Sequence, residues 1–323
     1  MWHSLFVKRP LTLRRSQDKA RSDVLATGNQ AMTEIVHHHI FKNAGTTVEW
    51  VLQRNFPGQV LHIEGDQPGA RLMPERVKSV ADGFSEHKAI SSHTFPLTDA
   101  QSAWASVHLV VLRDPIERYY SMYRYERSRE TPRPANIAAR QKDFGEYCKW
   151  WLSNAPGIWI DWQTRCCTPQ SKRASTPLAG APPKWVADLS AALEAVSNTA
   201  YAMTVDRFDE GLVVLEDRLH QSGIHFDASY IRQNVSPRES DGGREELLSE
   251  AFRAELVAAN AGDYALIQRV RDLVDDRYRE LDPSGERLAE FRRRCAALAG
   301  NCDALQVRVP GQSDWIVIAD SGP

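Results

Sequence analysis

Residues 106–112 read SVHLVVL, and five of these seven residues are aliphatic. Such a nearly continuous apolar run is typical of a β-strand that is buried on both faces. Strands of this kind occur in parallel sheets, which helices cover on both sides. The run therefore limits the chain to an α/β fold built on a parallel sheet.

The rest of the chain alternates between strand and helix patterns. Apolar spacing predicts strands at 34–41, 59–63, 88–93, 201–205 and 315–318, and helices at 46–55, 116–127, 144–152, 184–197, 210–221 and across 245–298. Residues 77–84 are mixed, and the proline-containing segments 129–136 and 168–183 are expected to be loops. We expect a single domain over residues 31–300, a polar leader at 1–30 and a C-terminal extension at 301–323.

Composition excludes several classes of protein. The sequence is 42% hydrophobic and 25% charged with a net charge of -2, so no overall field favours nucleic acid or an anionic membrane. No apolar run is long enough to cross a bilayer, and basic residues follow the short apolar patch at 5–7, the reverse of a secretory signal. Five cysteines without a CxxC pair favour a reducing, cytoplasmic setting, and a disulfide between Cys295 and Cys302 stays open.

The first candidate site is the segment HIFKNAGTT at residues 39–47, where a strand runs into a helix. Unpaired N–H groups and the helix dipole attract anions at a helix start. Gly45 allows close approach of the backbone, Thr46 and Thr47 offer hydroxyl donors, and Lys42 adds a mobile charge. The lysine precedes the glycine, so this is not a Walker A loop. A plain N-cap at Thr46 is the alternative.

The second candidate site is the segment RDPIERYYS at residues 113–121. Arg113 follows the buried strand and so lies at the edge where open α/β sheets bind ligands. Its guanidinium can grip a phosphate at two points, and Ser121 can add a hydroxyl two helical turns later. A structural salt bridge from Arg113 to Asp114 or Glu117 is the alternative.

Together, the two segments resemble the nucleotide-binding elements of the sulfotransferases that use 3′-phosphoadenosine-5′-phosphosulfate (PAPS), especially the carbohydrate group that includes the heparan 2-O-sulfotransferases. In that family the first loop reads like Pro-Lys-Thr-Gly-Gly-Thr-Ser and the second reads Arg-Asp-Pro-x-x-Arg-x-x-Ser. This chain differs at Phe41 and in the Asn43-Ala44 pair. Segments 162–165, 206–210 and 234–238 are also similar to the family's, so the resemblance spans residues 35–238.

The resemblance implies a single P-loop-type sulfotransferase domain that transfers a sulfuryl group from PAPS to an acceptor hydroxyl by in-line displacement, without a metal ion. The acceptor is expected to be a glycan or glycolipid. The residues implied to hold the 5′-phosphosulfate are Lys42, Asn43, Ala44, Gly45, Thr46 and Thr47, and those for the 3′-phosphate are Arg113 and Ser121. Lys42 would also stabilise the leaving oxygen, and His93 would be the base. Glu64 is the second candidate base, although a surface carboxylate is the expected role for it.

Several alternatives stay open. The chain could instead be a catalytically inactive protein that binds PAPS or adenosine bisphosphate, or a P-loop-type kinase, which would need magnesium. His37, His38 and His39 resemble a metal-binding tract, but neighbouring strand residues face opposite ways and we expect no carboxylate nearby to complete a ligand set. No metal site is therefore expected. The tryptophans at 150, 151, 159 and 162 could stack on a sugar or pack in a core.

Overall fold

The computed structural model describes residues 33–66, 72–84, 86–95, 97, 105–169, 187–198, 200–233, 248–300 and 316–318. The expected leader at 1–30 lies outside the described residues, as does the expected extension at 301–323 apart from 316–318. In the described part of the chain, no helix is both long and apolar enough to cross a membrane.

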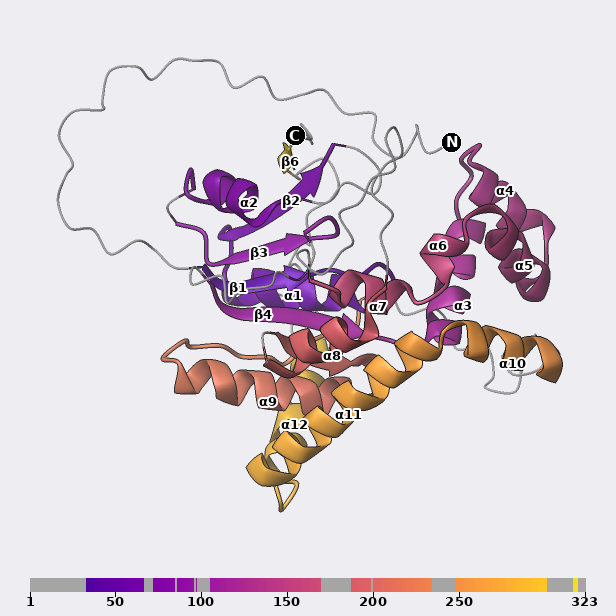
Figure 1. The fold of residues 1–323 in the computed structure, drawn as a ribbon. Helices are drawn as coiled ribbons and strands as arrows, with labels where there is room; N and C mark the ends of the chain where they lie inside the picture. Colours follow the sequence, from indigo (N-terminus) through magenta and orange to yellow (C-terminus); the bar gives the residue numbers. More distant parts are fainter. Residues whose placement is uncertain are drawn as a thin grey trace, which may run out of the picture.

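Six parallel strands form one sheet in the order β5-β4-β1-β3-β2-β6. Figure 1 shows this order from β4 through β1, β3 and β2 to β6. They are β1 (Thr33–His38), β2 (Val60–Gly65), β3 (Ala89–Ser92), β4 (Ala105–Leu112), β5 (Tyr201–Thr204) and β6 (Ile316–Ile318). The apolar run of β4 is fully buried, with Leu109 to Leu112 at most 1% exposed. This confirms the α/β fold with a parallel sheet, including the small strand near the C-terminus.

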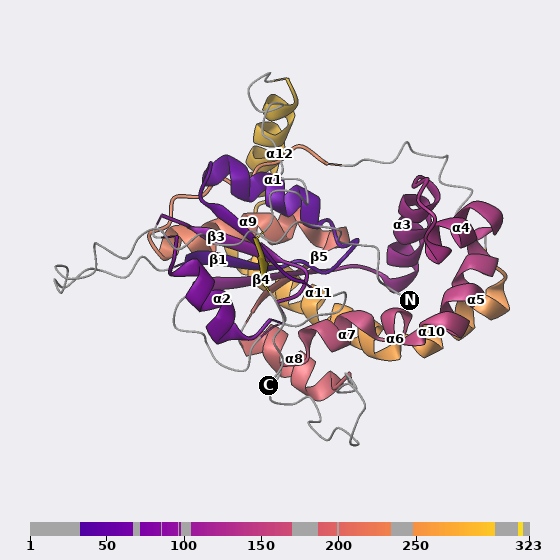
Figure 2. The ribbon, with the colours of Figure 1, turned by 90° about the horizontal axis from the view of Figure 1, so that it is seen from above.

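Helices cover both faces of the sheet. They are α1 (Gly45–Asn55), α2 (Pro74–Ala81), α3 (Pro115–Arg127), α4 (Pro134–Gln141), α5 (Phe144–Asn154), α6 (Pro156–Trp159), α7 (Trp162–Cys167), α8 (Leu189–Asn198), α9 (Phe208–Gln221), α10 (Glu250–Ala259), α11 (Ala261–Leu281) and α12 (Glu286–Ala299). Figure 2 shows α1 and α12 on one side of the sheet and α2 and α8 on the other. Each face of the sheet therefore has an apolar layer against it, as the β4 sequence requires.

Two predicted boundaries were wrong for identifiable reasons. The expected loop at 129–136 runs into α4, because Pro134 is the first residue of that helix, a position that proline tolerates well. The long helical stretch at 245–298 is three helices, and it breaks first at Asn260. The Asn260 side chain is fully buried and accepts a hydrogen bond of 2.7 Å from the Tyr119 hydroxyl, a tertiary contact that local spacing does not reveal.

A second, aromatic core lies among α3, α5 and α6, separate from the core against the sheet. Tyr119 and Trp159 lie ring to ring there, with centroids 3.8 Å apart, and Trp151 packs beside Trp159. Trp151 and Trp159 are both buried, so these two tryptophans are core residues. Trp150 and Trp162 are partly buried against the two cores.

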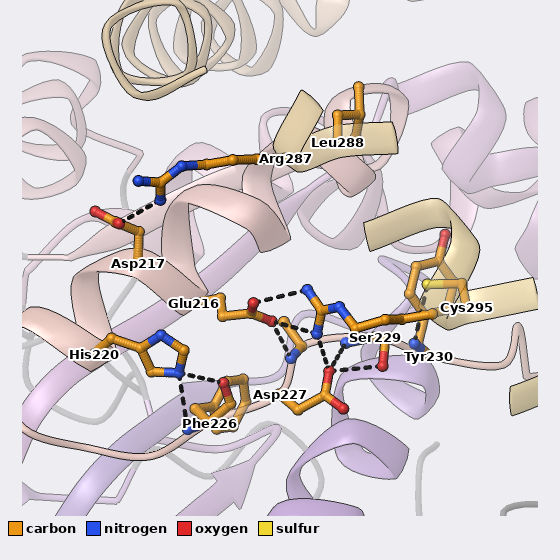
Figure 3. Close-up of polar contacts among 12 residues, drawn as sticks. Glu216, Asp217, His220, Phe226, Asp227, Ser229, Tyr230, Arg287, Leu288 and Cys295 are labelled. Atoms are coloured by element: carbon orange, nitrogen blue, oxygen red, sulfur yellow. Dashed lines mark hydrogen bonds and ion pairs between the residues drawn. The ribbon is translucent and has the colours of Figure 1, made fainter. Parts of the chain in front are cut away.

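Ion pairs hold α12 against α9 (Figure 3). Arg294 contacts Glu216 at 2.8 Å and Arg287 contacts Asp217 at 2.7 Å. On the same helix, Cys295 is a free thiol whose sulfur accepts a hydrogen bond from the Tyr230 backbone N–H at 3.3 Å. Cys302, its considered disulfide partner, lies outside the described residues.

Candidate active site

The strand order changes direction at the carboxyl end of β1. From β1 the chain continues through α1 to β2 on one side of the sheet, whereas from β4 it continues to β5 on the other side. Ligands of open α/β sheets bind outside the carboxyl ends of the strands at such a switch point. The loop after β1 carries Lys42, the loop after β3 carries His93, and the loop after β4 carries Arg113. The topology therefore brings three sequence-predicted residues to one edge of the sheet.

The loop between β1 and α1 has two left-handed residues that are not glycine. Lys42 has a φ of 70° and Ala44 a φ of 60°. This conformation costs an L-residue roughly 1–2 kcal/mol. Ala44 is the N-cap of α1 and makes no side-chain cap, so the alternative of a plain Thr46 cap is wrong. The loop keeps a strained shape, as binding loops often do.

Gly45 is required by the packing of the protein itself. A Cβ at this position would lie 1.9 Å from Nε2 of His39, far inside contact distance. Gly45 has no positive φ, so the need is for space and not for an unusual backbone angle. From the sequence, Gly45 was predicted to serve only the approach of an anion; its close packing against His39 is a separate requirement for glycine.

Asn43 and Gln163 join the two candidate loops. The Asn43 amide nitrogen donates to the Val111 carbonyl at 2.9 Å and to Gln163 Oε1 at 2.7 Å. Gln163 Oε1 also accepts from the backbone N–H of Arg113 at 2.8 Å, and its Nε2 donates to the Arg113 carbonyl at 2.7 Å. Asn43 is thus a buried brace between loops. The similarity of segment 162–165 marked the place of Gln163, but nothing in the sequence gave its partners.

The Arg113 side chain contacts the backbone of Lys42 at this edge. Arg113 Nη1 donates to the Lys42 carbonyl at 3.1 Å, and Arg113 Nη2 also makes the alternative salt bridge, to Glu117 Oε2 at 3.5 Å. Lys42 Nζ lies 4.2 Å from the ring centroid of Tyr125 and 5.3 Å from that of Phe41. Burial, followed by the nearby Arg113 charge, lowers the pKa of Lys42 to about 8. Lys42 remains mostly an ammonium at neutral pH.

The predicted hydroxyl residues lie on the helices that follow the two loops. Thr46 and Thr47 are in the first turn of α1, and Ser121 is half-buried on α3. Thr47 is buried, and its Oγ1 accepts a hydrogen bond of 3.3 Å from the Gln233 backbone N–H. Thr46 is half-buried.

His93 and Glu64, the two candidate bases, are hydrogen-bonded to each other. Glu64 Oε1 lies 2.9 Å from His93 Nδ1 and accepts from the His93 backbone N–H at 2.7 Å, while Oε2 accepts from Thr94 Oγ1 at 2.9 Å. Glu64 is 3% exposed, so the expected role as a surface carboxylate is wrong. Because an ionised carboxylate only accepts, it selects the imidazole tautomer with the proton on Nδ1 and the lone pair on Nε2.

A second buried carboxylate lies behind His93. The ring of His39 stacks on His93 with centroids 3.9 Å apart, and its Nδ1 lies 3.0 Å from Glu49 Oε1. His37 shares this face of β1, whereas His38 faces the other way and bonds His108 at 2.9 Å. The alternation was predicted correctly, but the expectation that no carboxylate lies nearby is wrong.

Comparison with known proteins adds a relative but no activity. No family model matches the sequence. The chain is 27% identical over 264 residues to an uncharacterized protein of Archaeoglobus fulgidus, and the match covers 74% of this chain and 96% of that protein. The chain is therefore similar to an archaeal protein over nearly the whole length of the latter.

Proposed function

We propose that this protein is a sulfotransferase that moves the sulfuryl group of PAPS to an acceptor hydroxyl, on a P-loop-type sulfotransferase domain. The observation that carries the proposal is the contact of 3.1 Å between Arg113 Nη1 and the Lys42 carbonyl. It joins the two segments that resemble the family's nucleotide-binding elements, at the edge of the sheet where a ligand is expected. His93 follows the neighbouring strand β3 and supplies a base beside them.

Each end of the nucleotide has its own anion-binding groups in this proposal. The 5′-phosphosulfate binds at the start of α1, where the unpaired N–H groups and Lys42 offer donors and positive charge. The 3′-phosphate binds Arg113 and Ser121. The 3.5 Å contact between Arg113 and Glu117 is long enough to yield to a phosphate, which forms stronger two-point hydrogen bonds with a guanidinium.

The chemical step is an in-line displacement at sulfur. The acceptor oxygen forms a bond to sulfur while the bond from sulfur to the bridging phosphate oxygen breaks, which releases adenosine 3′,5′-bisphosphate. His93 Nε2 takes the acceptor proton, and Glu64 stabilises the imidazolium that forms. Lys42 stabilises the negative charge that develops on the leaving oxygen. These steps use side chains alone and no metal ion.

Two aromatic rings beside His93 favour a glycan or glycolipid as the acceptor. Phe41 lies with its ring centroid 6.3 Å from that of His93, and Tyr125 packs edge-on against Phe41 at 5.6 Å. Both rings are half-buried. An aromatic face offers apolar area at little entropic cost, which suits the C–H face of a pyranose ring.

Calorimetric titration tests the nucleotide site first. We expect adenosine 3′,5′-bisphosphate to bind without magnesium, with the affinity lost in Arg113→Ala and kept in Arg279→Ala, a control at an exposed arginine of α11. Preference for ATP with magnesium would favour the kinase instead.

Turnover is then measured with PAPS and a panel of glycans and glycolipids, with mass spectrometry of the products. Sulfated product that disappears in His93→Ala, while bisphosphate binding persists, would support the assigned base. Nucleotide binding without product from any acceptor class would favour the inactive binding protein.

A further inference from the structure

Three imidazoles and one carboxylate form a cluster in the layer between the sheet and α1. Glu49 Oε1 lies 3.0 Å from Nδ1 of His39 and 3.6 Å from Nδ1 of His62. Ser91 Oγ donates to the same oxygen at 3.0 Å and lies 3.0 Å from His37 Nδ1. Hence the Nδ1 atoms of three histidines converge on a single carboxylate oxygen or on the hydroxyl bonded to it.

We propose that His37, His39, His62 and Glu49 bind one divalent transition-metal ion, with zinc as the preferred ion. One ligand atom each from His37, His39 and Glu49 already lies within 4.8 Å of the others. In a tetrahedral site with metal–ligand bonds of 2.0–2.2 Å, neighbouring ligand atoms are about 3.4 Å apart. The distances of 3.0 and 3.6 Å from Glu49 Oε1 lie on either side of that value.

The donor atoms come from regular elements that hold them in place. His37 and His39 are two residues apart in and just after β1, so they share one face, and their ring centroids are 5.0 Å apart. Glu49 projects from α1 and His62 from β2. All four residues are buried. A site of four protein ligands that excludes water has the form of a structural zinc site, not of a catalytic one.

Charge also favours a cation at this position. The Glu49 side chain is 6% exposed, and its ion-pair partners in the described residues are the imidazoles of His39 and His62, not a lysine or arginine. An isolated carboxylate is very costly to bury without a compensating charge. An imidazole-rich set with one carboxylate suits zinc and its neighbours in the first transition series, whereas magnesium and calcium prefer oxygen ligands alone.

The ion would support the candidate active site without taking part in the chemistry. His39 stacks on His93 at 3.9 Å and lies directly against Gly45 at the start of α1. A metal that fixes the His39 ring therefore fixes the packing surface of both His93 and the anion-binding loop. The inference does not depend on the sulfotransferase proposal, because the cluster is defined by its own residues.

Metal content and thermal stability of the full chain test the site. The purified protein is stripped with a chelator, incubated with Zn²⁺ alone, passed through a gel-filtration column and analysed by mass spectrometry for metal. We expect about one equivalent of zinc, the number for one four-ligand site, and a melting temperature that rises with Zn²⁺ concentration. Co²⁺ in place of zinc should give the visible absorption of a tetrahedral ion.

The variants Glu49→Gln, His37→Gln and His62→Gln should each lose the retained zinc and the cobalt spectrum. His38→Gln is the matched control, because His38 is buried on the same strand but bonds His108 on the opposite side. It should keep the metal even if it lowers stability. Three separate ligand variants guard against one that does not fold. Absence of retained zinc in the wild type, or equal retention in the folded ligand variants, would overturn the proposal.

Discussion

Gln163 provides the sharpest test of how the candidate site is held together. Its side chain is fully buried and bonds both loops, accepting from the Asn43 amide and the Arg113 N–H and donating to the Arg113 carbonyl. Asp263 anchors it from α11, since Asp263 Oδ2 accepts from Gln163 Nε2 and the Gln163 backbone N–H, each at 3.2 Å. Leucine has nearly the volume of glutamine but cannot make any of the side-chain bonds. Gln163→Leu therefore removes the polar bridge and leaves the packing in place.

The size of the effect follows from the groups that lose a hydrogen bond. The N–H and the carbonyl of Arg113 each lose their Gln163 partner, and Asn43 loses one of its two acceptors. Asp263 Oδ2 loses the Nε2 donor but keeps the Gln163 backbone N–H. Each buried polar group that is left unsatisfied costs about 1–3 kcal/mol. Arg113 is only half-buried, so water relieves part of the cost. We expect the free energy of unfolding to fall by about 2–4 kcal/mol.

The same substitution should weaken nucleotide binding, because Arg113 leaves β4 through the peptide that Gln163 holds. A loss of 1.4 kcal/mol in binding corresponds to about a tenfold rise in Kd, and we expect at least that for adenosine 3′,5′-bisphosphate. Urea unfolding followed by tryptophan fluorescence gives the stability, and calorimetry gives Kd. Gln221→Leu, on the exposed face of α9, should stay within about 0.5 kcal/mol of wild type. If Gln163→Leu is as stable as this control and binds as tightly as wild type, the bridging role is refuted.

Three further predictions concern the loop after β1. Gly45→Ala should lower the free energy of unfolding by about 3 kcal/mol or more, because the added Cβ would overlap the His39 ring. Gly300→Ala is the control and should have no such effect, because a Cβ there would lie 3.7 Å from the nearest atom. Urea denaturation measures both variants. Ala44→Gly should raise the free energy of unfolding by about 0.5–1 kcal/mol, since glycine adopts a φ of 60° without strain but adds entropy to the unfolded chain, and a fall would contradict the strained geometry. Because only the ammonium form of Lys42 attracts phosphate and its pKa is about 8, affinity for adenosine 3′,5′-bisphosphate should already fall between pH 7 and 8, to about half, and fall more steeply above pH 8. Lys42→Arg should remove this slope in calorimetry.

Much of the fold can be predicted from local sequence patterns, and the elements that were mispredicted depend on tertiary contacts or on loop conformation. The apolar run at 106–112 predicts β4 because a strand buried on both faces needs no partner to be recognised. Strand β1 ends at His38, three residues before the predicted end, because a loop with two left-handed residues follows it. The residue types of Lys42 and Ala44 do not predict that conformation. Glycine signals it most clearly in a sequence, and asparagine or aspartate less often.

The candidate site, too, could be predicted only in part. The positions of Lys42, His93 and Arg113 after three strands were readable, because parallel strands bring their carboxyl ends to one edge. The side chains that contact the site residues could not be predicted. Glu64 approaches His93 because β2 and β3 are neighbours in the sheet, and Glu49 approaches His39 because α1 folds back over β1. Such contacts depend on strand order and on the angle between a helix and the sheet, and sequence spacing specifies neither.

The loop itself shows how one motif can serve two physical needs. The sulfotransferase loop that it resembles has two consecutive glycines, and the corresponding residues here are Ala44 and Gly45. Ala44 takes the left-handed φ of 60°, which a side chain tolerates at a cost, whereas Gly45 has an ordinary φ but no room for a Cβ beside His39. The first position is therefore open to replacement and the second is not. An alanine at position 44 is the departure from the motif that this packing permits, and the steric demand at Gly45 ties the loop after β1 to the histidine cluster beneath it.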